Sequence, residues 1–247
     1  CHFCFSLWGR SWNARSVAGV LKEISHLHET TRFQHLQFVD DTFNVDPERV
    51  KAICQGILDS RLAFTWECGA RVDYADREMF RLMRESGCIR CAFGVPSTDD
   101  ALLKKINKEA MARQIELAFR LADEAGLWAD ATVLVGNLGE TRETLRNTAD
   151  TLARCRIKGL SAQRIVVFPS THLYRRMVQR NLLEDGYWLR HDEAPLFTEE
   201  FTAEQLFEQI AYLNWKTLPR IGDYRGALRN FMTYVAVHVL WSLHLTV

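Results

Sequence analysis

Short apolar runs alternate with amphipathic segments along most of the chain. The apolar runs are typical of buried β-strands, and the segments between them repeat apolar residues at helical spacing. This alternation predicts parallel βαβ units joined by right-handed crossovers, in an α/β fold. The predicted strands cover about residues 36–39, 62–70, 89–95, 129–135 and 162–168.

Capping residues mark the ends of several predicted helices. Asp46-Pro47 starts one helix, because Asp caps a helix and Pro fits its first position. Asp76 starts another, and Gly87 suits the end of that helix. A further helix is expected from about residue 141 to residue 158, with Gly159 as its stop.

The pattern changes in the last quarter of the chain. Residues 184–198 form a polar, irregular stretch, and Thr202 with Gln205 then makes a capping box before a helix. We therefore predict a (β/α) core over residues 1–183 and a helical C-terminal extension over residues 184–247.

Composition and charge limit the classes of partner. The 31 basic and 31 acidic side chains cancel, which argues against broad binding of nucleic acid. Seven cysteines, an odd number, favour free or metal-bound thiols in a reducing, cytoplasmic compartment. The apolar stretch 231–247 predicts a packing helix, with peripheral membrane contact as the alternative.

Periodicity does not separate an open doubly wound sheet from a (β/α) barrel. In either fold, chemistry is carried by the C-terminal ends of the strands. The residues expected there are polar or contain glycine: Asp40-Asp41, Ala70-Arg71, 94–97, 136–140 and 169–171.

Cys1-His2-Phe3-Cys4 is the sharpest local motif. Two thiolates three positions apart in a tight loop bind one metal ion or part of a cluster. Taken alone, the C-x-x-C spacing fits zinc, a redox pair or iron–sulfur equally.

The other cysteines are interpreted as structural. Cys88 and Cys91 form a second C-x-x-C, but strand side chains three positions apart point to opposite faces. Cys88 is therefore assigned to a turn and Cys91 to the core. Cys54 and Cys155 lie on predicted helix stripes and Cys68 in a predicted strand, where buried free cysteine is common.

The order of motifs resembles the radical S-adenosylmethionine (SAM) superfamily. The similarity is to its branch with an N-terminal cobalamin-binding domain, which includes anaerobic magnesium-protoporphyrin ester cyclases and hopanoid-modifying proteins. The resemblance runs from Cys1 to about Leu183. It implies a partial (β/α)6 TIM-like barrel of radical SAM type, whose first strand would precede Cys1.

The resemblance assigns roles to the N-terminal loop. In that family a C-x3-C-x-Φ-C loop, with Φ aromatic, holds a 4Fe-4S cluster. Cys1 and Cys4 match its second and third cysteines, and Phe3 its aromatic residue. The first cysteine is expected four residues before Cys1.

Further motifs match strand ends. Asp40 belongs to a stretch similar to the second-strand motif near the SAM methionyl group, and Arg71 resembles the third-strand arginine that reaches the SAM carboxylate. Ser97, Gly136 and Glu140 match the later motifs that hold SAM.

The resemblance also implies a reaction. One electron, supplied by a donor such as flavodoxin or ferredoxin, passes through the cluster and cleaves SAM to a 5′-deoxyadenosyl radical. Cobalamin would be held by a domain outside this chain, and this chain alone is expected to be inactive. The implied outcome is methyl transfer, oxidation or cyclisation of a small apolar substrate, such as a tetrapyrrole or an isoprenoid lipid.

Two alternatives remain open. Residues 94–97 read Gly-Val-Pro-Ser where the family has Gly-Val-Glu-Ser, and Pro96 removes a carboxylate and a backbone donor. A degenerate, non-catalytic barrel that acts as a binding module is one alternative. The other is a zinc-dependent (β/α)-barrel hydrolase or aldolase, in which His2 or His172 joins Cys1 and Cys4.

Overall fold

A computed structural model describes residues 1–5, 12–184, 186–190, 198, 200–222, 224, 225, 228, 229 and 232. In this part of the chain, five parallel strands form one open sheet in the order β1-β2-β3-β4-β5. The predicted α/β class and parallel sheet are confirmed. The strands are β1 (His35–Phe38), β2 (Thr65–Ala70), β3 (Cys88–Gly94), β4 (Trp128–Val135) and β5 (Gly159–Arg164).

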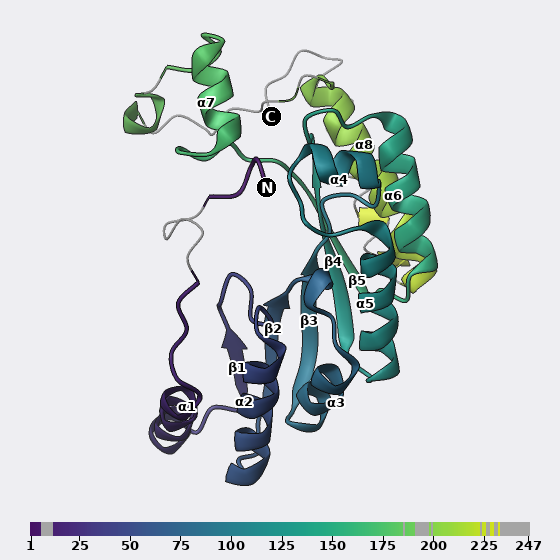
Figure 1. Ribbon diagram of the computed structural model, residues 1–247. Coiled ribbons are helices and arrows are strands. Elements are labelled where there is room, and N and C mark those ends of the chain that lie inside the picture. Colours follow the sequence, from purple (N-terminus) through teal and green to yellow (C-terminus); the bar gives the residue numbers. More distant parts are fainter. Residues whose placement is uncertain are drawn as a thin grey trace.

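Helices cover one face of the sheet. Figure 1 shows α2, α3, α5 and α6 along that face, while the extended segment before α1 runs on the side of the opposite face. Short 3-10 turns cover Val72–Tyr74, Tyr187–Arg190 and Leu218–Ile221. The helices are α1 (Val17–Thr31), α2 (Pro47–Ser60), α3 (Arg77–Glu85), α4 (Asp100–Lys105), α5 (Ala112–Glu124), α6 (Arg142–Arg154), α7 (His172–Gln179) and α8 (Ala203–Thr217).

The predicted caps form as local hydrogen bonds. The Asp46 carboxylate accepts from the Arg49 amide at 3.1 Å, and the Asp76 carboxylate accepts from the Met79 amide at 2.7 Å. Gly87 follows the end of α3 and has a φ of 98°. A Cβ at this position would lie 2.5 Å from the backbone oxygen of Phe64, in the loop before β2. The two carboxylates satisfy backbone amides that the starts of α2 and α3 would otherwise leave unpaired.

Helix α6 is shorter than the sequence predicts. It ends at Arg154, and β5 already begins at Gly159 rather than at residue 162. A Cβ on Gly159 would lie 2.3 Å from the Asp130 carboxylate of β4, so this glycine permits close strand pairing rather than stopping a helix. Cys155 consequently caps the helix in an extended conformation and does not lie on its stripe.

A β-bulge corrects the placement of the second C-x-x-C motif. Trp66 pairs with Cys88, but the next residue of β2, Glu67, pairs with Arg90, so Ile89 is an extra residue in β3. The extra residue shifts the alternation of faces by one position. Cys88 and Cys91 are therefore both buried, and the prediction that they point to opposite faces is wrong.

One hydrophobic core lies between the sheet and its helices. Trp66, Phe93 and Phe119 are completely buried there, and the rings of Phe93 and Phe119 meet edge to face at 5.3 Å. Leu206 and Leu213 of α8 belong to the same core. The start of the predicted extension thus packs on the barrel part, and the boundary at residue 183 stays a prediction.

The rest of the extension is described only in part. The capping box of Thr202 and Gln205 is confirmed, but Phe207 of the predicted stripe is 36% exposed. The apolar tail 231–247 lies outside the described residues apart from Met232. Among the helices that the structure describes, none has the length and apolar character needed to span a membrane.

Candidate functional site

The N-terminal C-x-x-C loop is held at the C-terminal edge of the sheet. The His2 amide donates to the carbonyl of Ile106, after α4, and the Leu173 amide of α7 donates to the His2 carbonyl. The Cys4 amide donates to the Cys1 carbonyl at 3.3 Å and closes the turn. Cys1 is half-buried and Cys4 is exposed. Both thiols therefore lie on one turn at the C-terminal edge of the open sheet, which we call the mouth.

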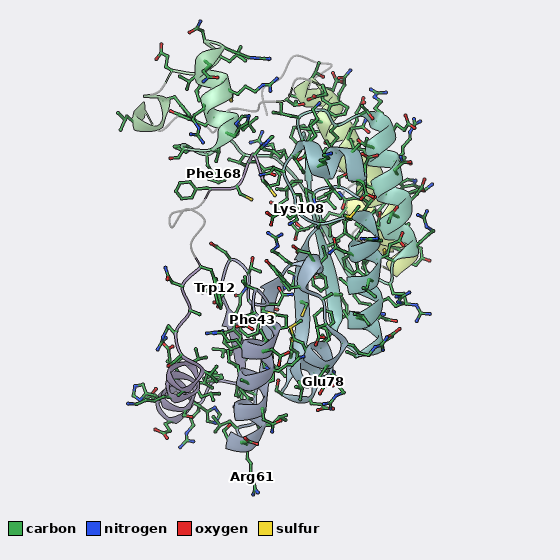
Figure 2. The ribbon with its side chains drawn as sticks, in the orientation of Figure 1. Trp12, Phe43, Arg61, Glu78, Lys108 and Phe168 are labelled. Carbon is green, nitrogen blue, oxygen red and sulfur yellow. The ribbon has the colours of Figure 1, made fainter. Side chains whose placement is uncertain are left out.

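Aromatic contacts fasten this loop to the segment after β5. The rings of His2 and His172 lie 4.5 Å apart, and burial, followed by the charge of His172, lowers the pKa of His2. Phe5 meets Phe168 at 6.4 Å, and Figure 2 shows the Phe168 ring extended toward the N-terminal segment. Phe3 packs on the small apolar cluster that includes Leu173.

Arg71 follows β2 and is fixed on both its backbone and its side chain. Its Nε and Nη2 donate to the two Asp73 carboxylate oxygens at 2.9 and 2.6 Å, which raises the pKa of Arg71. Asn44, fully buried, accepts from the Arg71 amide at 2.8 Å and donates to its carbonyl at 2.9 Å. The loop after β1 thereby positions Arg71, although Asn44 was not identified from the sequence.

Lys108 connects the thiol loop to Arg71. Burial, and then the charge of Arg71, lower the pKa of Lys108, while Asp73 and Cys4 act in the opposite direction. Its Nζ lies 4.0 Å from the position that a Cβ would take on Gly94, at the end of β3. In Figure 2 it lies near the N-terminal segment, at the upper ends of the strands. Nothing in the sequence marks this lysine, because it lies in a loop without a motif.

The loop between β4 and α6 is organised by a buried carboxylate. Glu140 accepts from the amides of Gly136 at 2.6 Å and of Asn137 at 3.2 Å, and burial raises its pKa to about 7. Gly136 has a φ of 101°, a conformation that side chains disfavour. Asn137 donates to the Leu134 carbonyl at 2.7 Å, while its buried Oδ1 has no hydrogen-bond partner.

Two predicted residues lie at the edge of this arrangement. Ser97 is buried, accepts from the Asp99 amide at 3.1 Å and contacts the Thr148 hydroxyl at 3.4 Å, so it organises the start of α4. Asp40 is exposed and lines a hollow of about 340 Å³ on the inner face of β1 to β3, together with Gly69. Their roles in binding SAM stay predictions.

The cysteine thiols of the described residues do not all lie at one possible metal site. Among the described residues, the group of three metal-ligating side chains that lie within 4.8 Å of one another is Cys68, Cys88 and Cys91, in the core. Cys1 and Cys4 have no third protein ligand of this kind beside them in the described chain. The mouth therefore offers two thiolates, next to the cations Lys108 and Arg71.

Comparisons with curated proteins identify related enzymes. An uncharacterized methyltransferase, PH0819, of Pyrococcus horikoshii is 27% identical over 227 residues, which are 90% of this chain and 50% of that protein. The anaerobic magnesium-protoporphyrin IX monomethyl ester cyclase of Rubrivivax gelatinosus is 26% identical over 152 residues, which are 60% of this chain and 27% of the cyclase. The chain thus spans half or less of these relatives.

Solved structures share the fold. The cobalamin-dependent SAM radical enzyme OxsB, solved with aqua-cobalamin and SAM, superposes with a TM-score of 0.66 at 18% identity, over 96% of this chain and 43% of its own. The radical SAM methyltransferase TsrM of Kitasatospora setae, solved with cobalamin and a [4Fe-4S] cluster, gives 0.61 at 21% identity, over 67% of this chain and 32% of its own. The model of the radical SAM superfamily matches residues 1–152, and the chain belongs to that superfamily.

Proposed function

We propose that this chain is the catalytic barrel of an enzyme that cleaves SAM to a 5′-deoxyadenosyl radical and uses cobalamin in a methyl transfer. The observation that carries the proposal is the turn of Cys1 and Cys4, held beside Lys108 and Arg71 at the mouth of the barrel. The methyltransferase PH0819 and the enzymes OxsB and TsrM support the class of reaction.

The residues present fit the cofactors by their chemistry. Thiolates are the ligands that iron–sulfur clusters require, and Cys1 and Cys4 offer two on one exposed turn. The remaining ligand would be the first cysteine of the motif, expected four residues before Cys1. When bound, the cluster supplies the electron that breaks the S–C5′ bond of SAM.

Charge at the mouth suits the methionyl part of SAM. Burial, and then the charge of Arg71, lower the pKa of half-buried Lys108, and a carboxylate between the two cations would offset both effects. Arg71 donates one edge of its guanidinium to Asp73 and keeps donors on its other edge. The unpartnered Asn137 Oδ1 would accept from a donor of the bound nucleoside.

The same proposal implies a class of substrate and two kinds of partner. We expect a small apolar substrate, an electron donor of the flavodoxin or ferredoxin type, and a cobalamin-binding domain outside this chain. Peripheral membrane contact would rest on the apolar tail 231–247 alone. Zinc hydrolysis is set aside, because the family match covers the thiol loop and no third ligand joins it among the described residues.

The test uses the complete protein, including the sequence that precedes Cys1, reconstituted anaerobically with iron and sulfide. We expect formation of 5′-deoxyadenosine from SAM with a strong reductant, and methyl transfer once cobalamin and substrate are supplied. Cys4→Ala should abolish cleavage, whereas the matched control Cys155→Ala, far along the chain, should not. Full cluster loading without any SAM cleavage would overturn the proposal and favour the non-catalytic binding module.

A further inference from the structure

Three cysteine thiols meet inside the protein, separate from the pair at the mouth. Cys68 comes from β2, and Cys88 and Cys91 come from β3. Their Sγ atoms all lie within 4.8 Å of one another, and those of Cys68 and Cys91 are 4.0 Å apart. The bulge at Ile89 is what brings Cys88 onto the same face as Cys91.

The spacing suits a single metal ion. Sulfurs that each bind one central ion at about 2.3 Å lie about 4 Å from one another. In a four-iron cluster each thiolate binds a different iron, which spreads the thiolates farther apart. The trio therefore has the dimensions of a one-ion site, unlike the open turn of Cys1 and Cys4.

The surroundings select a soft ion. All three cysteines are at most 4% exposed and belong to the hydrophobic core that includes Trp66. No carboxylate or imidazole joins the trio among the described residues, so hard cations have no ligands there. Thiolates alone favour ions such as copper(I) and zinc(II).

Within the described chain, the three thiols have few other polar partners. A hydrogen bond joins the thiols of Cys68 and Cys91, and the Cys88 thiol donates to the Arg90 carbonyl at 3.5 Å. A bound cation would displace the thiol protons, as metal ions do at cysteine sites.

We propose that Cys68, Cys88 and Cys91 bind one thiophilic d10 metal ion, which ties β2 to β3 inside the core. Three sulfurs complete the coordination of copper(I), whereas zinc(II) would recruit a fourth ligand. The site is independent of the proposed reaction at the mouth.

The experiment loads the ion during folding, because the thiols are enclosed in the core. The whole chain carrying Cys1→Ser and Cys4→Ser, which removes the thiols at the mouth, is refolded anaerobically with zinc(II) or with copper(I). Weakly bound metal is removed with a mild chelator. Metal content, sulfur-to-metal charge-transfer absorption and the number of sulfur ligands by X-ray absorption are then measured.

We expect about one ion per chain, bound through three sulfurs for copper(I) or three or four for zinc(II), and a higher melting temperature with the ion present. Cys91→Ser should lower retention at least tenfold and abolish the thermal shift. Cys155→Ser, which changes a cysteine outside the trio, should retain the ion. Cys68→Ser provides the same test if Cys91→Ser does not refold, as judged by circular dichroism.

Three results would overturn the proposal. The first is a folded parent protein that retains no more ion than Cys91→Ser. The second is an ion bound through oxygen or nitrogen rather than through sulfur. The third is a loss of two mass units that maps to a Cys68–Cys91 disulfide when the chain is refolded with the ion and an added disulfide oxidant.

Discussion

Cysteines gather in two places in this molecule, and their surroundings differ. Cys4 is exposed on a turn near the cation Lys108, which is itself influenced by the charge of Arg71. Cys91 is completely buried in the hydrophobic core, and its sulfur lies within 4.8 Å of those of Cys68 and Cys88. The first arrangement leaves room for exchangeable ligands and a charged cofactor. The second arrangement is proposed to hold one metal ion bound by sulfur alone. Cysteine is thus proposed to bind a reactive cofactor in the first place and to stabilise the core in the second.

Removal of the thiols at the mouth should have the largest effect. In the complete reconstituted protein, Cys1→Ser with Cys4→Ser should abolish SAM cleavage, because serine does not replace a thiolate on iron. In the cluster-free protein, the free energy of unfolding should change by less than about 1 kcal/mol, since Cys4 is exposed and Cys1 is only half-buried. Iron content and 5′-deoxyadenosine formation measure the loss of SAM cleavage, and urea unfolding measures the change in stability. A variant that still cleaves SAM would contradict the assignment of this turn.

The cation beside the turn should have the next largest effect. Lys108→Met removes a charge proposed to meet the SAM carboxylate, and the affinity for SAM should fall about 10- to 100-fold. Lys108→Arg keeps the charge and should lose less. Equilibrium binding of SAM to the reconstituted protein measures the difference, with iron content as the control. Equal affinity in Lys108→Met and wild type would remove Lys108 from the site.

Substitution in the trio should affect stability rather than SAM. In the metal-free protein, Cys91→Ser puts a hydroxyl into an apolar core and should lower the free energy of unfolding by about 1–3 kcal/mol. Cys155→Ser, at a half-buried helix end, should cost less. Urea unfolding of both variants makes the comparison. If Cys91→Ser costs no more than Cys155→Ser, the trio does not contribute to the core as described.

An effect of comparable size concerns pH and the loop after β4. Burial raises the pKa of Glu140 from 4.5 to about 7. The folded protein therefore keeps a proton that the unfolded chain releases, and stability falls as pH rises from about 4.5 to about 7. Glu140→Gln should lose this dependence, since its amide oxygen still accepts from the Gly136 amide.

Urea unfolding at pH 5 and pH 8 measures that difference. Wild type should lose about 1–3 kcal/mol more than Glu140→Gln between the two pH values. Parallel pH profiles for the two proteins would show that Glu140 is ionised in the folded state throughout this range.

The sequence predicted the fold well because its signals are local. Asp46 and Asp76 cap helices through amides three residues away, and the apolar runs mark all five strands. The errors arose where contacts with a neighbouring strand determined the local structure. Gly159 reads as a helix stop, yet it is required by the Asp130 carboxylate of the adjacent β4.

The candidate site was predicted only in part for the same reason. Cys1, Cys4 and Arg71 belong to motifs that a sequence can display. Lys108 and Asn44 belong to none, because their importance depends on which loops meet at the edge of the sheet.

The sequence by itself determined the repeating βα units, their caps and the superfamily to which the chain belongs, since these depend on periodicity and motif order. Only the tertiary structure decided which thiols meet. A single bulged residue, Ile89, reverses the face that strand alternation assigns to Cys88, and strand register then places it beside Cys68 and Cys91. Register is a property of paired strands. The paired strands are separated along the chain, so a local sequence pattern does not reveal their register.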